Sequence, residues 1–73
     1  TLDGAVARES NFDEVLFAGA NLRNFDAAGC SFQRADFRGA SLLGANLAGA
    51  DLTGARLDGV DLSGVNLRQA LLN

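Results

Sequence analysis

The groups in this chain that could do chemistry are nearly all carboxylates. Its 73 residues include nine Asp and Glu, six Arg and one cysteine, Cys30, but no His. Without His there is no imidazole base and no imidazole metal ligand, and one cysteine cannot form a multi-cysteine zinc site. Paired carboxylates become a general acid and base only where burial or a close partner in a pocket shifts their pKa. A catalytic role therefore requires a fold that builds a cleft around them.

The glycine spacing indicates which elements carry these groups. All nine glycines, from Gly4 to Gly64, fall in one five-residue register. Leu or Phe occupies 13 of the 15 positions spaced by five from Leu2 to Leu72. A period of five matches neither the 3.6 residues of a helix nor the alternation of a strand. It indicates an array of one small repeating unit.

Each unit has five positions: small apolar, polar, large apolar, variable and glycine, as in Ala45–Gly49 and Ala50–Gly54. In an extended segment the first and third side chains point to one side and the second to the other. Glycine at the fifth position suits a corner. Each unit is therefore predicted to be a very short strand and a turn. The third positions are predicted to form a core column of Leu2, Phe12, Phe17, Leu22, Phe32, Phe37, Leu42, Leu47, Leu52, Leu57, Leu62, Leu67 and Leu72.

Two patterns favour four units in each coil. The order Leu, Ala, Phe, Phe at third positions begins at Leu2 and again 20 residues later, at Leu22. A spacing of 20 also aligns opposite charges, as in Glu14 with Arg34, whereas a three-unit coil would align like charges, as in Arg8 with Arg23. Opposite charges across neighbouring strands stabilise a sheet and like charges destabilise it. The other opposite pairs at this spacing are Asp3 with Arg23, Asp36 with Arg56 and Arg38 with Asp58.

The tandem Ala-Asn-Leu-Ala-Gly at 45–49 and Ala-Asp-Leu-Thr-Gly at 50–54 resemble the repeats of the pentapeptide repeat family. The resemblance implies an all-β fold, a right-handed four-sided parallel β-helix, here with about 3.6 coils of four units. It implies no catalytic residue, cofactor or metal. It also brings an expectation about partners, because some bacterial members bind DNA gyrase as DNA mimics.

We expect one solenoid over residues 1–73, with a less regular first coil at 1–19 and regular coils at 20–73, forming a segment of a longer protein. In the first half Glu9, Ser10, Glu14, Asn24 and Arg34 break the repeat pattern. Terminal repeats are commonly atypical. The alternative is an acidic cluster facing a basic partner. The residues predicted to form an interaction surface are Glu9, Asp13, Glu14, Asp26, Asp51 and Asp61.

Three residues depart from the unit at inward positions. Phe25 takes a small-residue position and Ala27 the large one that follows, which is either a size exchange within one unit or the mark of a ligand-shaped dent. Cys30 takes a small inward position, where a buried cysteine acts as a small apolar side chain. A reactive thiol would instead need exposure and a basic neighbour.

Composition and the family resemblance leave two hypotheses for function. The net charge of −3 disfavours direct binding to nucleic acid, and no apolar run is long enough to span a membrane. The single cysteine favours the cytoplasm. The first hypothesis is a non-enzymatic scaffold or protein–protein interaction module, with end-to-end association through the last layer, Leu62, Leu67 and Leu72. The second is a DNA mimic that binds DNA gyrase or another type II topoisomerase.

Overall fold

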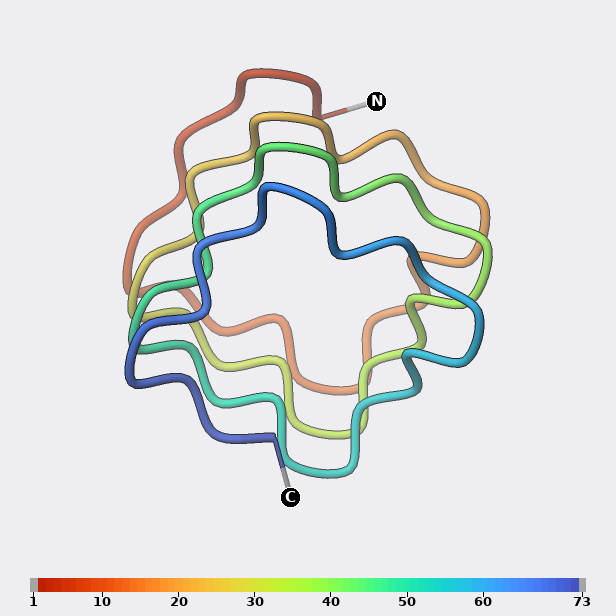
Figure 1. Ribbon diagram of the computed structural model, residues 1–73. Coiled ribbons are helices and arrows are strands. Elements are labelled where there is room, and N and C mark those ends of the chain that lie inside the picture. The colour runs from red at the N-terminus through yellow and green to blue at the C-terminus, as the bar shows by residue number, and fades with distance from the viewer. Residues whose placement is uncertain (1, 73) are drawn as a thin grey trace.

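The computed structural model describes residues 2–72, which wind as stacked loops around one axis (Figure 1). The first residues (red) and the last (blue) lie in loops at opposite ends of the stack. Each unit contributes at most one residue to a parallel bridge, at its second position, followed by a turn. The bridges are Val6↔Asp26, Asn11↔Ser31, Leu16↔Asp36, Asn21↔Ser41, Asp26↔Asn46, Ser31↔Asp51, Asp36↔Arg56, Asn46↔Asn66 and Asp51↔Leu71.

Every one of these bridges joins residues 20 apart, which is four five-residue units. Backbone hydrogen bonds keep the same register: the Phe12 N–H donates to Ser31 O at 2.7 Å, and the Ser31 N–H donates back to Ser10 O at 3.0 Å. A third bond, from the Glu14 N–H to Gln33 O, is 2.8 Å long. The described bridges and these hydrogen bonds thus share one register.

The corners are left-handed at every fifth position. All nine glycines have φ between 69° and 74°, and Glu9, Glu14, Asn24, Arg34 and Gln69 have φ between 56° and 64° at the same place in the unit. Left-handed backbone is uncommon for residues with a side chain. These five residues therefore replace the glycine of the repeat with a residue that has a side chain, but they keep the left-handed backbone conformation of the glycines.

The inward side chains form one continuous core. Fully buried residues occupy first and third positions from Phe17 to Leu52. Five phenylalanines pack within it: Phe12 stacks on Phe32 with ring centroids 5.4 Å apart, and Phe17 stacks on Phe37 at 5.2 Å. Offset stacked and edge-to-face rings at such distances stabilise a core beyond their buried area.

Phe25 and Ala27 exchange sizes, and both are buried. Phe25 is 1% exposed and Ala27 0%. The Phe25 ring meets the edge of Phe12, with centroids 6.0 Å apart and planes at 70°. Both residues thus lie buried on the inward side, as a size exchange within one unit predicts.

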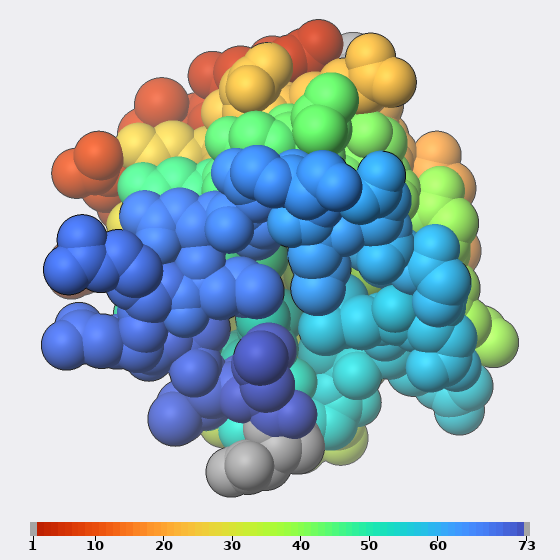
Figure 2. Space-filling model, in the orientation of Figure 1, coloured from red at the N-terminus to blue at the C-terminus, as the bar shows by residue number. Residues whose placement is uncertain are grey.

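Burial falls off towards both ends of the column. Leu2, Phe12, Leu57, Leu62 and Leu67 are only partly buried against the core. Leu72, predicted in the last layer of the core column, is 54% exposed. No described coil stacks on residues 53–72, and this end of the column faces the viewer in Figure 2.

We expect replacement of one inward leucine to be far more destabilising than replacement of an outward one. Leu52 is 2% exposed and Leu43 is 48% exposed, and both sit in regular units. Leu52→Ala should lower the free energy of unfolding by about 2–5 kcal/mol, because it leaves a cavity in the core. Leu43→Ala should change it by less than about 0.5 kcal/mol. Urea denaturation of the two variants checks this, and equal losses would contradict the inward and outward assignment.

A second pair of variants tests crowding between stacked corners. A Cβ on Gly54 would lie 3.1 Å from Arg34 Cγ, whereas a Cβ on Gly59 would have no atom within 4 Å. Both glycines have positive φ, 72° and 71°, so alanine should cost about 1–2 kcal/mol at either position. Gly54→Ala should cost more, because the Arg34 side chain must also move. The measurement is the melting temperature of each variant, and a larger loss for Gly59→Ala would refute the crowding argument.

Candidate interaction surfaces

The outward Asp and Asn side chains close the turns that follow them. At eight second positions an Asp or Asn oxygen accepts a hydrogen bond from the backbone N–H two residues later, at 2.8 to 3.4 Å. This fourth-position N–H has no backbone acceptor within residues 2–72, so the side chain satisfies it. Such Asx turns are a common local role for Asp and Asn. The eight are Asn11, Asn21, Asp26, Asp36, Asn46, Asp51, Asp61 and Asn66.

One outer face carries a polar ladder made of Asp13, Ser31, Gln33, Asp51 and Thr53. Ser31 stands where most units have Asp or Asn, and the missing acceptor comes from the preceding coil: the Gln33 N–H donates to Asp13 Oδ1 at 2.8 Å. The Ser31 hydroxyl donates to the same oxygen. The Gln33 side chain continues the ladder by donating from Nε2 to Asp51 Oδ2 at 2.7 Å. Asp51 also accepts from the Thr53 hydroxyl at 2.6 Å.

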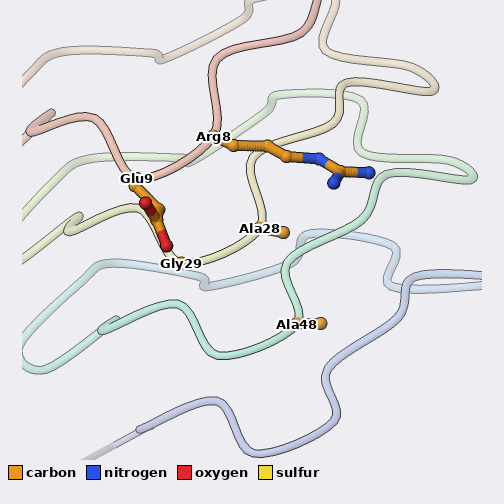
Figure 3. A pocket seen from close by; sticks show the side chains of 5 residues that line it. All are labelled: Arg8, Glu9, Ala28, Gly29 and Ala48. Carbon is orange, nitrogen blue, oxygen red and sulfur yellow. The ribbon is translucent and has the colours of Figure 1, made fainter.

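The neighbouring face has a shallow hollow of about 460 Å³ lined by Arg8, Glu9, Ala28, Gly29 and Ala48 (Figure 3). Ala28 and Ala48 occupy fourth positions in successive coils, and their small side chains leave the space. The Glu9 side chain extends towards Gly29, while Arg8 extends along the surface. Arg8 is engaged with Asp26, its Nη2 and Nε both lying 2.9 Å from Asp26 Oδ2.

Two further ion pairs lie on the outer surface. Glu14 and Arg34, at stacked corners 20 residues apart, pair at 3.1 Å as their spacing predicts. Asp36 faces Arg56 across a parallel bridge, as the spacing predicts, and its ion pair is with Arg38, at 2.8 Å. Arg38 is favoured because it follows Asp36 in the same turn and can bond both carboxylate oxygens. Arg56 adds only a weaker attraction.

These contacts keep four aspartates ionised. Hydrogen bonds from Arg38 lower the pKa of Asp36 from 3.8 to about 2. The Arg8 side chain lowers the pKa of Asp26, and the Thr53 and Gln33 side chains lower that of Asp51. The Ser63 hydroxyl and backbone N–H lower the pKa of Asp61. None of the four can hold a proton for general acid catalysis at neutral pH.

The six residues predicted to form an interaction surface thus have separate surroundings. Asp13 and Asp51 are joined through Gln33, Asp26 pairs with Arg8, and Glu14 pairs with Arg34. Glu9 lines the hollow, and Asp61 accepts two hydrogen bonds from Ser63. The roles of Gln33, Thr53 and Ser63 were missed. The spacing of two residues between an Asp and a following hydroxyl side chain was the available signal for Thr53 and Ser63.

Cys30 is 1% exposed, and its Sγ donates to the Ala7 carbonyl oxygen of the preceding coil. This placement is that of a small inward side chain.

Across residues 2–72 the structure contains no group of three or more His, Cys, Asp or Glu arranged to hold a metal ion. It likewise contains no helix within that range that is long and apolar enough to cross a membrane.

Stacked five-residue turns, an apolar column inside and Asx-closed corners outside define the chain as a β-solenoid repeat protein. The family model for pentapeptide repeats matches eight copies over residues 1–33 and 30–69. The chain therefore belongs to the pentapeptide repeat family, whose members form right-handed β-helices. The predicted family membership and β-helix class are confirmed.

Two solved structures place the chain among longer relatives. Its fold matches that of the pentapeptide repeat protein Rfr23 from the cyanobacterium Cyanothece 51142 with a TM-score of 0.89 and 30% identity, covering 93% of this chain and 47% of that one. HetL, from the cyanobacterium Nostoc sp. strain PCC 7120, shares 34% identity over 97% of this chain and 31% of its own, with a TM-score of 0.48. The chain thus spans less than half of either protein. No curated protein matches it significantly.

The Asp36–Arg38 pair predicts a defined pH dependence of stability. Because the folded-state pKa of Asp36 lies below its ordinary 3.8, the pair stabilises the fold above about pH 4 and this contribution is lost as the pH falls to about 2. Asp36→Asn should therefore flatten the stability curve between these values. Urea denaturation at each pH measures the curve.

Arg38→Gln is the matched variant for that experiment. It keeps the Asp36 carboxylate and removes the guanidinium, so the Asp36 pKa measured by NMR should rise towards 3.8. An unchanged pKa would show that Arg38 is not the cause of the shift.

Proposed function

We propose that this chain is a non-enzymatic scaffold, a protein–protein interaction module built as a right-handed four-sided β-helix of about 3.6 coils. The 20-residue register of its bridges supports the four-sided coil. The observation that carries the proposal is the use made of the outer carboxylates: Asp26, Asp36, Asp51 and Asp61 all close turns and accept further side-chain hydrogen bonds. The first role of these four aspartates is to stabilise the turns, which keeps the outer surface rigid.

A partner would meet preorganised side chains on this surface. In the polar ladder, Gln33 is fixed by bonds to Asp13 and Asp51, and Thr53 is fixed by Asp51. Side chains held in one conformation lose little entropy on binding, which favours recognition. We place the protein in the cytoplasm of a bacterium. The single cysteine, which cannot form an internal disulfide, and the similarity to a cyanobacterial protein support this location.

The alternative proposal is a DNA mimic that binds DNA gyrase or another type II topoisomerase. The acidic net charge favours it, but the charge density does not. No principal dimension of the Cα trace exceeds 21 Å, and a DNA duplex of that length carries about 12 negative charges. This chain has a net charge of −3, and three of its acidic residues are paired with Arg.

A supercoiling assay separates the two proposals. The purified chain, titrated into DNA gyrase and relaxed plasmid, should leave supercoiling unchanged if it is a scaffold. Inhibition at micromolar or lower concentration would favour the DNA mimic. Asp13→Asn, Asp58→Asn and Asp61→Asn should then weaken the inhibition.

The scaffold proposal has its own test in the native cells. A tagged chain should co-purify with one defined protein, and Gln33→Ala should remove that protein while the fold is retained. The matched control is Ser63→Ala. This variant removes a hydroxyl that donates a hydrogen bond to Asp61, in a unit that contributes no residue to the polar ladder. Retention of the partner by Gln33→Ala would exclude the polar ladder as the recognition surface.

A further inference from the structure

Two glutamates take the left-handed corners of neighbouring units, and their surroundings differ. Glu9 has φ 59° and Glu14 has φ 64°. The corner that stacks on Glu14 is Arg34, whose Nε lies 3.1 Å from Glu14 Oε2. The corner that stacks on Glu9 is Gly29, which has no side chain to offer. Within residues 2–72 the Glu9 carboxylate has no hydrogen bond and no ion pair.

The hollow lies directly beside this unpaired carboxylate (Figure 3). Its floor consists of Ala28, Gly29 and Ala48, whose side chains are small or absent. A Cβ on Gly29 would lie 3.1 Å from Glu9 Cγ, so the stem of Glu9 rests against the glycine. Arg68, at the fourth position of the coil after Ala48, does not line the hollow. The hollow therefore combines a floor of small side chains with one free carboxylate.

The other charged residue of the hollow is already neutralised. Arg8 Nη2 and Nε both lie 2.9 Å from Asp26 Oδ2. Figure 3 shows the Arg8 and Glu9 side chains extending in different directions. Because Arg8 and Asp26 cancel, the charge left at the hollow is the single negative charge of Glu9.

We propose that the hollow receives an arginine side chain of a partner protein, with its guanidinium on the Glu9 carboxylate and its stem over Ala28 and Ala48. This inference rests on the scaffold function proposed above, because it assigns the arginine to a partner. The Glu14–Arg34 pair shows the same contact made within the molecule. A guanidinium can bond both oxygens of a carboxylate, and the methylenes of an arginine stem pack on apolar surface.

Other occupants fit the hollow less well. An acidic side chain would be repelled by the Glu9 carboxylate, which has no cation of its own chain beside it. An apolar side chain would remove water from that carboxylate without pairing it, which is costly. Charge and shape therefore favour the same occupant, a long cationic side chain with an apolar stem.

An NMR titration tests the site without the partner. N-acetylarginine amide should shift the amide signals of Glu9, Gly29 and Ala48 in a saturable manner. N-acetylcitrulline amide has the same shape without the charge and should bind more weakly. Glu9→Gln should weaken the binding of the arginine probe about three- to fivefold, the scale of one exposed ion pair. The matched control is Glu14→Gln, which removes the same charge at the corner paired with Arg34 and should leave binding unchanged.

A second pair of variants tests the floor of the hollow. Ala48→Leu fills the space and should abolish binding of the arginine probe. A leucine is compatible with this position, because Leu43 occupies the fourth position of the preceding unit. Ala18→Leu is the matched control, since Ala18 is an exposed fourth-position alanine outside the hollow. If Ala48→Leu does not fold, Glu9→Gln still decides, because it changes one exposed side chain.

The titration overturns the proposal if the arginine and citrulline probes bind equally. It does so too if Glu9→Gln and Glu14→Gln have the same effect.

Co-purification with the same variants separates this inference from the scaffold proposal. If the unmodified chain captures one defined protein, Glu9→Gln and Ala48→Leu should reduce its recovery, and Glu14→Gln should not. Equal recovery with all three variants would overturn the hollow as the arginine site and leave the scaffold proposal standing. If the unmodified chain captures no protein, the scaffold proposal fails, and the assignment of the arginine to a partner fails with it.

Discussion

The structure depends on a left-handed corner at every fifth residue. The corner turns the chain after each short strand. As a result, the third-position side chain of the next unit again points to the axis. The second-position backbone of that unit again pairs with the neighbouring coils. Positions with a side chain at the corner are compatible with this only where the stacked corner leaves room. Glu9 and Arg34 lie against Gly29 and Gly54 of the following coil. Glu14 and Arg34 occupy stacked corners of neighbouring coils. Both corners carry side chains, and these side chains form an ion pair.

The corner also explains why the outer face is rich in Asp and Asn. The turn leaves the fourth-position N–H without a backbone acceptor, and an Asp or Asn two residues earlier supplies one. Unpaired backbone donors are costly where water is excluded, and the second position is half-buried between stacked strands in the middle coils. In such a fold, outward Asp residues therefore serve first to close turns. Their number is weak evidence for an acidic partner-binding surface.

The period and the inward positions could be read from the chain because they follow from spacing, and the 20-residue register could be read from the repeated order of third positions and the alignment of opposite charges. The partners of charged side chains could not. Arg8 pairs with Asp26, 18 residues away, and Arg38 with Asp36, two residues away, because a long guanidinium reaches diagonally or back along its own turn. The hollow lies partly on the unit of Phe25 and Ala27, where a dent was the alternative to a size exchange, but its two fourth-position alanines were not singled out. Leu72 obeys the pattern of the column, but no described coil covers it, so its exposure depends on a neighbour and not on its own residue type.

Burial in a stacked column is a property of neighbouring coils. Leu22, Leu42, Leu47 and Leu52 are at most 2% exposed because coils lie on both sides, whereas Leu57, Leu62 and Leu67 have the same residue type and only one covered side. A short column therefore has a large fraction of its apolar surface at its two ends, and each added coil buries as much as the last.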